Sequence, residues 1–176
     1  MDSPARSGNL FLDRGNRMKI RCLGKDEVKQ AIAIICERIR WMDEMHLRQW
    51  NVTDYLSCYP YSYFESLVAK KELYGAFEEG KLIGIAALFS SDERWQGAED
   101  ALYVHHLAVL PGYSGTGAAL LSFCEQQARN RGKSFLRLDA QKGNERLNDY
   151  YEKQGFTYVC EMIEGAYEGI KRQKKL

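Results

Sequence analysis

The sequence predicts a mixed α/β fold, in which a central β-sheet carries helices on both faces. Three observations lead to this prediction. Strand-length apolar runs alternate with helix-length amphipathic patterns, Glu79-Gly80 joins two β-rich runs as a hairpin, and a later strand–helix–strand unit implies a parallel crossover. The chain of 176 residues is close to the size of one domain. We therefore expect residues 18–176 to form a single domain.

The first 17 residues differ from the rest of the chain. They are polar, contain glycine and precede a second methionine, Met18, which opens a strand-like segment. We expect residues 1–17 to be an N-terminal extension that need not be ordered.

Composition excludes several classes of protein. The formal net charge is +1, so the overall electrostatic field of the protein would not attract nucleic acid or a membrane surface. The five cysteines lie at least 14 positions apart, which excludes zinc knuckles and CxxC redox centres. The chain shows neither a secretory leader nor a run of 18 apolar residues. We expect a cytoplasmic protein that needs no metal and binds neither nucleic acid nor membrane.

The first half of the domain opens with a strand over residues 18–23, and Asp26 is the expected N-cap of the helix that follows. The apolar residues at helical spacing in this helix are Val28, Ile32, Ile35 and Ile39. Residues 41–69 are aromatic and irregular, which indicates short helices within a loop-rich segment.

The second half carries the remaining strands and two helices. The expected strands are residues 72–78, 81–89, 103–109, 135–140, 156–163 and 167–171, and the expected helices are residues 114–131 and 144–154. Gly132 and Gly155 are typical helix stops. We interpret the closing basic cluster of Lys171, Arg172, Lys174 and Lys175 as a solvated tail.

A glycine-rich turn follows the strand at residues 103–109. Residues 111–119 read Pro-Gly-Tyr-Ser-Gly-Thr-Gly-Ala-Ala and open a helix, whose first N–H groups and dipole favour an anion. A tight strand-to-helix turn that needs glycine would explain the same residues. Leu120 replaces the third glycine of a dinucleotide-binding fingerprint, and no GK[ST] is present, so neither nucleotide motif fits.

Two segments, LAVLPGYSGTGAALL and LNDYYEKQGFTYV, resemble the GNAT superfamily of acetyl-CoA-dependent N-acyltransferases. The resemblance implies the GNAT fold, with acetyl-CoA as cosubstrate. It implies that CoA pyrophosphate meets backbone amides of Ser114, Gly115, Thr116, Gly117, Ala118 and Ala119. It implies that pantetheine pairs, at a bulge in the preceding strand, with the backbone of Leu107, Ala108 and Val109. Ser114 replaces the usual Gln or Arg and could cap the helix, and Leu147 replaces the usual Ala.

Tyr151 is the candidate general acid. Asn144, Leu147 and Tyr151 share one face of the predicted helix. A phenol of pKa ~10 stays protonated at neutral pH and can donate to a departing thiolate of pKa ~8.5. In GNAT enzymes the matching Tyr commonly has this role, and the residue matching Asn144 contacts the cofactor. The other interpretation is that Tyr150 and Tyr151 are core aromatics.

The acceptor amine must lose a proton, but the sequence identifies no base clearly. His105 and His106 are adjacent on a strand, so we expect at most one of them to face a cleft. Aromatic and acidic residues upstream suit a cationic amine. The candidate substrate-binding residues are Trp41, Trp50, Tyr61 and His105. Core packing would explain each of the aromatic residues equally well.

Together these features predict an N-acetyltransferase that moves an acetyl group from acetyl-CoA to a primary amine in a ternary complex. The amine could belong to a small molecule or a peptide, and a homodimer is left open. The alternative is a non-catalytic module of the same fold that binds acyl-CoA as a sensor or recruits a partner.

Overall fold

The computed structural model describes residues 11–12, 18–95 and 100–176, with residues 11–12 described by their backbone alone. The elements in chain order are β1 (Phe11–Leu12), β2 (Met18–Cys22), α1 (Val28–Glu44), α2 (Tyr55–Cys58), α3 (Tyr61–Ala69), β3 (Leu73–Glu78), β4 (Lys81–Phe89), β5 (Ala101–Val109), α4 (Thr116–Asn130), β6 (Phe135–Gln141), α5 (Glu145–Lys153), β7 (Thr157–Glu164) and β8 (Tyr167–Lys175), with 3₁₀ turns at Lys25–Glu27 and Trp50–Val52. Of the expected N-terminal extension, residues 11–12 pair with β2, and its other residues lie outside the described part.

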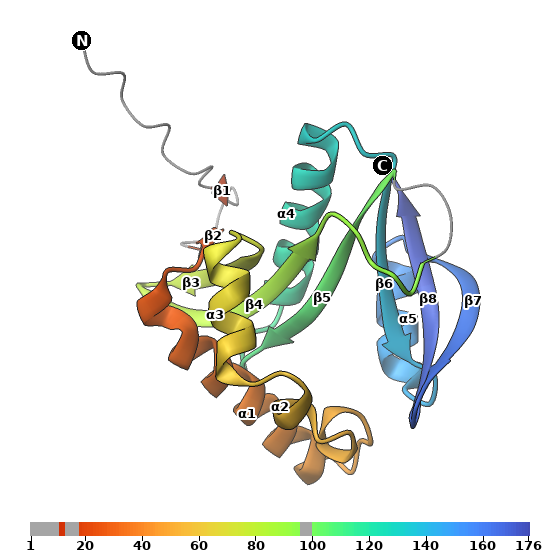
Figure 1. Cartoon of the computed structure of the whole chain (residues 1–176), viewed down its shortest axis with the longest axis horizontal. Coiled ribbons are helices and arrows are strands. Elements are labelled where there is room, and N and C mark those ends of the chain that lie inside the picture. The colour runs from red at the N-terminus through yellow and green to blue at the C-terminus, as the bar shows by residue number, and fades with distance from the viewer. Residues whose placement is uncertain (1–10, 13–17, 96–99) are drawn as a thin grey trace.

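The strands form one mixed sheet in the order β1-β2-β3-β4-β5-β6-β8-β7, which confirms the predicted fold class (Figure 1). Every pairing is antiparallel except that between β5 and β6. The expected β3–β4 hairpin is present. Glu79 and Gly80 both have positive φ, at 50° and 83°, as a two-residue turn of the hairpin type requires.

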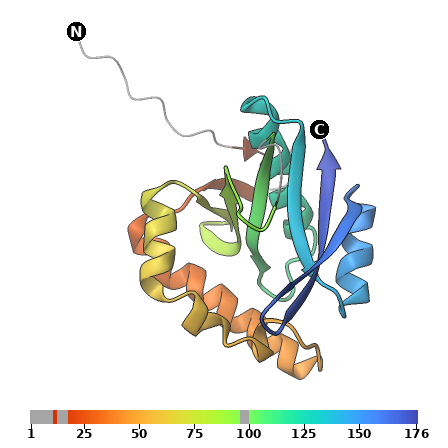
Figure 2. The same ribbon diagram turned by 45° about the vertical axis from the view of Figure 1, so that its right-hand side comes forward.

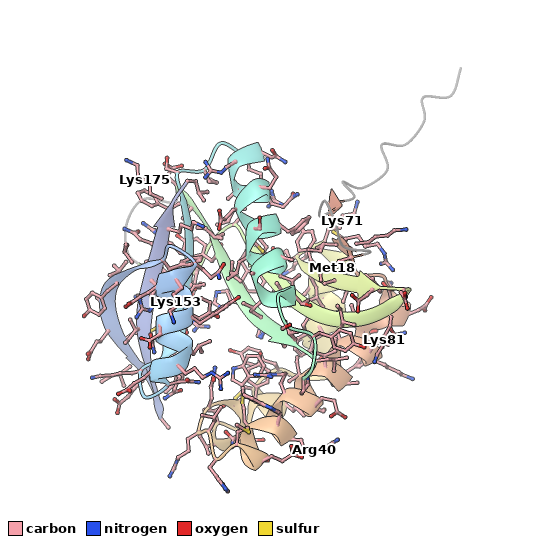
Figure 3. The ribbon with its side chains drawn as sticks, turned by 180° about the vertical axis from the view of Figure 1, so that it is seen from behind. Met18, Arg40, Lys71, Lys81, Lys153 and Lys175 are labelled. Atoms are coloured by element: carbon pink, nitrogen blue, oxygen red, sulfur yellow. The ribbon has the colours of Figure 1, made fainter. Side chains whose placement is uncertain are left out.

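Helices cover both faces of the sheet. On one face α1 packs against β4 and β5, and α3 packs against β3 (Figure 2). On the other face α4 contacts β4, β5 and β6, and α5 contacts β6. Figure 3, seen from behind, shows α4 and α5 in front of the strands. Each face therefore has its own apolar core.

The parallel strands β5 and β6 are neighbours over only part of their length. They pair at Ala101, Leu102 and Tyr103, opposite residues 135–137, and at no later residue. In Figure 1 the two strands run apart below this point. The later part of β5 therefore has backbone groups with no strand partner on the side of β6.

Both boundaries of the first helix differ from the expectations. The Glu27 carboxylate accepts the Gly24 N–H at 2.8 Å, so a 3₁₀ turn opens the first helix and Asp26 is not its N-cap. Helix α1 continues to Glu44 and includes Trp41.

The basic cluster at the end of the chain is not a solvated tail. Strand β8 runs to Lys175 and lies between β6 and β7, and Arg172 is 3% exposed. Within the described residues, no helix has the length and apolar character needed to span a membrane.

Candidate functional site

A cavity of about 1000 Å³ lies between the diverging strands. Its walls come from β5, the glycine-rich turn, β6, α5 and the aromatic segment after α1. The expected site residues that line it are Trp41, Trp50, His105, Leu107, Val109, Ser114, Gly115, Gly117, Asn144 and Tyr151. Residues far apart in the sequence thus share one cavity.

Other expected residues do not line the cavity. Tyr61, at the start of α3, is 40% exposed and lies outside the lining, so the structure does not bring it to the site. Ala108 is buried in the core under α1 and α3. Thr116, Ala118 and Ala119 also lie outside the lining, so only their backbone could serve an anion.

The glycine-rich turn presents backbone N–H groups. Gly115 is the N-cap of α4 and has a φ of 83°, a conformation that glycine adopts at little cost. The amides of Thr116, Gly117 and Ala118 follow it and have no acceptor within the helix. The Ala119 amide donates to the Gly115 carbonyl at 3.0 Å, so the expected anion contact there is already taken. Ser114 does not cap the helix.

Asn144 begins α5 and ties it to the opposite wall. Its side-chain oxygen accepts the Leu147 N–H at 3.1 Å, which caps the helix. Its side-chain nitrogen donates to Gln49 Oε1 at 3.3 Å. Beneath it, Asn148 donates to the carbonyls of Gln141 and Asn144, at 2.9 Å each. The first turn of α5 is therefore fixed on several sides.

Tyr151 belongs to both the core and the cavity. Its ring packs edge-on against Phe156 and is 6% exposed, yet the residue lines the cavity. Its hydroxyl makes no hydrogen bond within the described part of the chain. Burial, with smaller contributions from Tyr150 and Asp139, raises the pKa of Tyr151 above the usual value of 10. The phenol therefore stays protonated at any ordinary pH.

A β-bulge brings both histidines to the cavity. Ala87 of β4 pairs with His105, and Ile85 pairs with Ala108, so β5 has one extra residue in this interval. His106 has a φ of 51° there. Because the bulge breaks strand alternation, both His105 and His106 line the cavity, and the expectation that at most one would do so is wrong.

His106 is buried between two tyrosines. Its Nδ1 bonds the Tyr55 hydroxyl, and its Nε2 lies 2.8 Å from the Tyr63 hydroxyl. Burial, helped by charge on His105 and Arg94, lowers the pKa of His106 to about 3. The ring is therefore neutral and fully engaged, as a structural histidine would be.

His105 begins a polar network that the sequence did not reveal. His105 Nε2 lies 2.9 Å from Asp92 Oδ2. Arg94 lies 3.4 Å from Asp139 Oδ1, and Tyr167 donates to the other oxygen of Asp139 at 2.6 Å. These partners come from a loop and from β6 and β8, so no sequence spacing links them.

The composition of this network would also suit a divalent cation. Asp92, His105 and Asp139 offer ligand atoms within 4.8 Å of one another. However, Arg94 lies within ion-pair distance of both carboxylates, at 3.7 Å from Asp92 and 3.4 Å from Asp139. The group therefore already has a cation among its carboxylates.

Aromatic side chains form a further wall of the cavity. Trp50 stacks on Tyr55, with ring centroids 4.6 Å apart and planes 25° apart. The guanidinium of Arg38 lies 4.0 Å above the Trp41 ring. The cavity thus combines flat aromatic surfaces with buried charged groups.

Comparison with known proteins gives a consistent picture. The model of the acetyltransferase (GNAT) family matches residues 39–156. The uncharacterized N-acetyltransferase YesJ of Bacillus subtilis is 19% identical over 143 residues, covering 76% of this chain and 78% of that protein.

Solved structures resemble the whole fold. A GNAT-family acetyltransferase from Listeria monocytogenes has a TM-score of 0.76 at 22% identity, covering 96% of this chain and 100% of its own. The PaiA N-acetyltransferase of Thermoplasma acidophilum, solved in complex with coenzyme A, has a TM-score of 0.74 at 19% identity, covering 90% of this chain and 99% of its own.

Proposed function

The chain belongs to the acetyltransferase (GNAT) family, and from this premise we propose that it transfers an acetyl group from acetyl-CoA to a primary amine, with both substrates in the cavity at once. One observation carries the proposal. Gly115 and Gly117 at the start of α4 line the same cavity as Tyr151 and the aromatic wall. An anion site, a proton donor and an apolar acceptor surface are thus combined.

The residues present fit CoA. The amides of Thr116, Gly117 and Ala118 suit the pyrophosphate, because no side chain at Gly115 or Gly117 holds a phosphate away from the backbone. Ser114 lacks the long side chain of the usual Gln or Arg, so binding would depend on these amides.

The unpaired edge of β5 suits the amide-bearing arm of the cosubstrate. Beyond Tyr103, β5 has no β6 partner, so backbone groups of Leu107 and Val109 can pair with amides of pantetheine as a neighbouring strand would. In this proposal the thioester end of the molecule would lie between the diverging strands. When bound, acetyl-CoA supplies an activated acetyl thioester.

Tyr151 is proposed to donate the proton that the departing CoA sulfur takes up. Its ring is held by core packing, so only the hydroxyl needs to face the reacting atoms. Its raised pKa keeps that proton in place until a thiolate develops nearby.

Two measurements test the proposal. Acetyl-CoA or CoA should raise the melting temperature of the full chain, whereas NAD and ATP should not. Acetyl-CoA should then release free thiol in the presence of at least one amine from a panel of spermidine, phenylethylamine, Nα-acetyl-lysine and a short peptide with a free N-terminus.

The two results separate the possible functions. A melting shift with CoA but no thiol release with any amine would identify a non-catalytic acyl-CoA-binding module. The absence of any shift at millimolar CoA would exclude both functions.

A further inference from the structure

We propose that His105, paired with Asp92, is the catalytic residue that accepts the proton given up by the acceptor amine, an inference that rests on the proposed acetyl transfer. As the amine nitrogen forms its bond to the acetyl carbon, the carbon–sulfur bond breaks and its electron pair stays on sulfur. The proton from nitrogen goes to the His105 imidazole, and the sulfur takes its proton from Tyr151. After the products leave, His105 gives its proton to solvent and Tyr151 takes up a proton from solvent.

The pair has a defined tautomer. Burial raises the pKa of Asp92, but hydrogen bonds from His105 and from the Arg94 backbone N–H outweigh it, and the pKa of Asp92 is lowered overall. An ionised carboxylate only accepts, so His105 Nε2 must donate to it. The lone pair of His105 therefore lies on Nδ1, which has no hydrogen-bond partner within the described part of the chain.

Asp92 is built to stabilise a charged imidazole. Its side chain is 7% exposed, and its Oδ1 accepts the Arg94 N–H at 2.9 Å, which fixes the carboxylate in place. A buried carboxylate that holds one nitrogen of an imidazole orients the ring and stabilises the imidazolium that forms on proton uptake.

The fold also fixes the His105 ring at the cavity. Its ring stacks on Phe89, with centroids 4.8 Å apart and planes 28° apart. The bulge at His106 allows His105 to line the cavity beside its neighbour. The His105 side chain is 10% exposed, so it is shielded from bulk water while facing the cavity.

Other groups near His105 are already engaged. The titratable and charged side chains around it are Asp92, Arg94, His106, Asp139 and Tyr167. Both nitrogens of His106 meet tyrosine hydroxyls, and both oxygens of Asp139 meet Tyr167 or Arg94. Among these groups, His105 has a ring nitrogen, Nδ1, that is free to accept a proton, while its other nitrogen is bonded to the Asp92 carboxylate.

The test compares pH profiles of kcat/KM in the full chain, using the panel amine that the wild type acetylates. The wild-type rate should fall toward low pH as His105 is protonated. His105→Asn should lower kcat by about 10²-fold or more and remove this fall in rate at low pH, which is the acidic limb of the profile. Asp92→Asn should move the limb to lower pH, because the imidazolium loses its charged partner.

Histidine NMR provides a readout that a purely structural role would not change. The chain has three histidines, so the His105 signals can be assigned by their loss in His105→Asn. The His105 pKa measured by NMR should fall in Asp92→Asn by the same amount as the kinetic limb. The control is His46→Asn, because His46 is exposed and lies outside the cavity lining, and asparagine tolerates its φ of 53°.

The outcomes separate this inference from the proposed function. If the wild type releases no thiol, both are overturned. If the wild type turns over and the limb is unchanged in His105→Asn or Asp92→Asn, with the melting temperature and CoA shift retained, only the role of His105 is overturned.

Discussion

The hydroxyl of Tyr150 lies 3.0 Å from the point that a Cβ atom on Gly117 would occupy. Gly117 does not have a positive φ, so the requirement for glycine here is one of space. The absence of a side chain allows α5 to approach the first turn of α4 and leaves the amides there uncovered. Two helices that are separate in sequence thus share the proposed phosphate site.

Gly117→Val should abolish the melting shift caused by CoA, because the branched side chain would cover these amides. In the wild type, a ligand at ~100 times its dissociation constant adds about 2.7 kcal/mol, or roughly 5–10 °C for a chain of this size. Differential scanning fluorimetry measures the shift. The control Gly24→Val should keep it, since a Cβ at Gly24 meets only a carboxylate oxygen at 3.7 Å. A folded Gly117→Val protein with the full shift would place CoA elsewhere.

Tyr151→Phe should lower kcat by ~10² to 10⁴-fold while leaving the CoA shift and the melting temperature almost unchanged. The substitution keeps the buried ring and removes only the hydroxyl. Because burial raises the pKa of the phenol, the wild-type rate should not fall through Tyr151 ionisation up to pH ~10.

Tyr150→Phe is the matched control for this substitution. Both rings line the cavity, but neighbouring helix positions differ in direction by about 100°, so only one hydroxyl can aim at the sulfur. Tyr150→Phe should keep kcat near the wild-type value. Equal rates for the wild type and Tyr151→Phe, with chemistry limiting, would exclude Tyr151 as the donor.

The predictable parts of this protein were those set by local sequence. The β3–β4 hairpin followed from Glu79-Gly80, and the α4 turn followed from its glycines, because backbone conformation at these residues is decided locally. The same holds for α5, where Asn144 caps the helix as its residue type favours. The motifs of this half of the domain therefore located the part of the cavity lining that comes from the glycine-rich turn and α5.

The remaining parts depended on long-range packing. Strand alternation predicted that His105 and His106 would diverge, but a bulge in β5 overrides it, and only the resemblance to the GNAT superfamily implied a bulge in this strand. Asp92 and Asp139 lie near His105, although one is in a loop and the other is on β6, and no sequence spacing links the three. The basic residues after β7 looked solvated because β8 reads as polar, although it is an inner strand of the sheet.

Arg172→Met should lower the free energy of unfolding by about 2–3 kcal/mol. Arg172 Nε donates to Asn148 at 2.9 Å, and Nη2 donates to Glu152 at 3.1 Å, so the side chain ties β8 to the helix that carries Tyr151. Its loss leaves the buried Asn148 oxygen without this donor. Urea denaturation measures the change. Lys175→Met, at an exposed position of the same strand, should change stability by less than ~0.5 kcal/mol, and an equal effect of the two would contradict this role.

The last prediction concerns His106 and the stability of the fold in acid. Its folded-state pKa of about 3 lies below the ~6.5 of an unfolded histidine, so between these values only the unfolded chain binds the proton. Stability from this group is therefore complete above pH ~6.5 and is lost as pH falls toward 3, at up to ~1.4 kcal/mol per pH unit.

His106→Asn should isolate this contribution, because asparagine accepts the φ of 51° and does not titrate. At pH 7 the variant should be less stable by about 1–3 kcal/mol, since the buried Tyr55 hydroxyl loses its partner. As pH falls, the unfolded wild type takes up a proton on His106 that the folded protein does not bind, whereas the variant has no such group, so the difference between the two proteins should shrink between pH 6.5 and 4. Urea denaturation across this range measures it. A difference that stays constant with pH would mean that His106 is protonated in the folded protein as readily as in the unfolded chain.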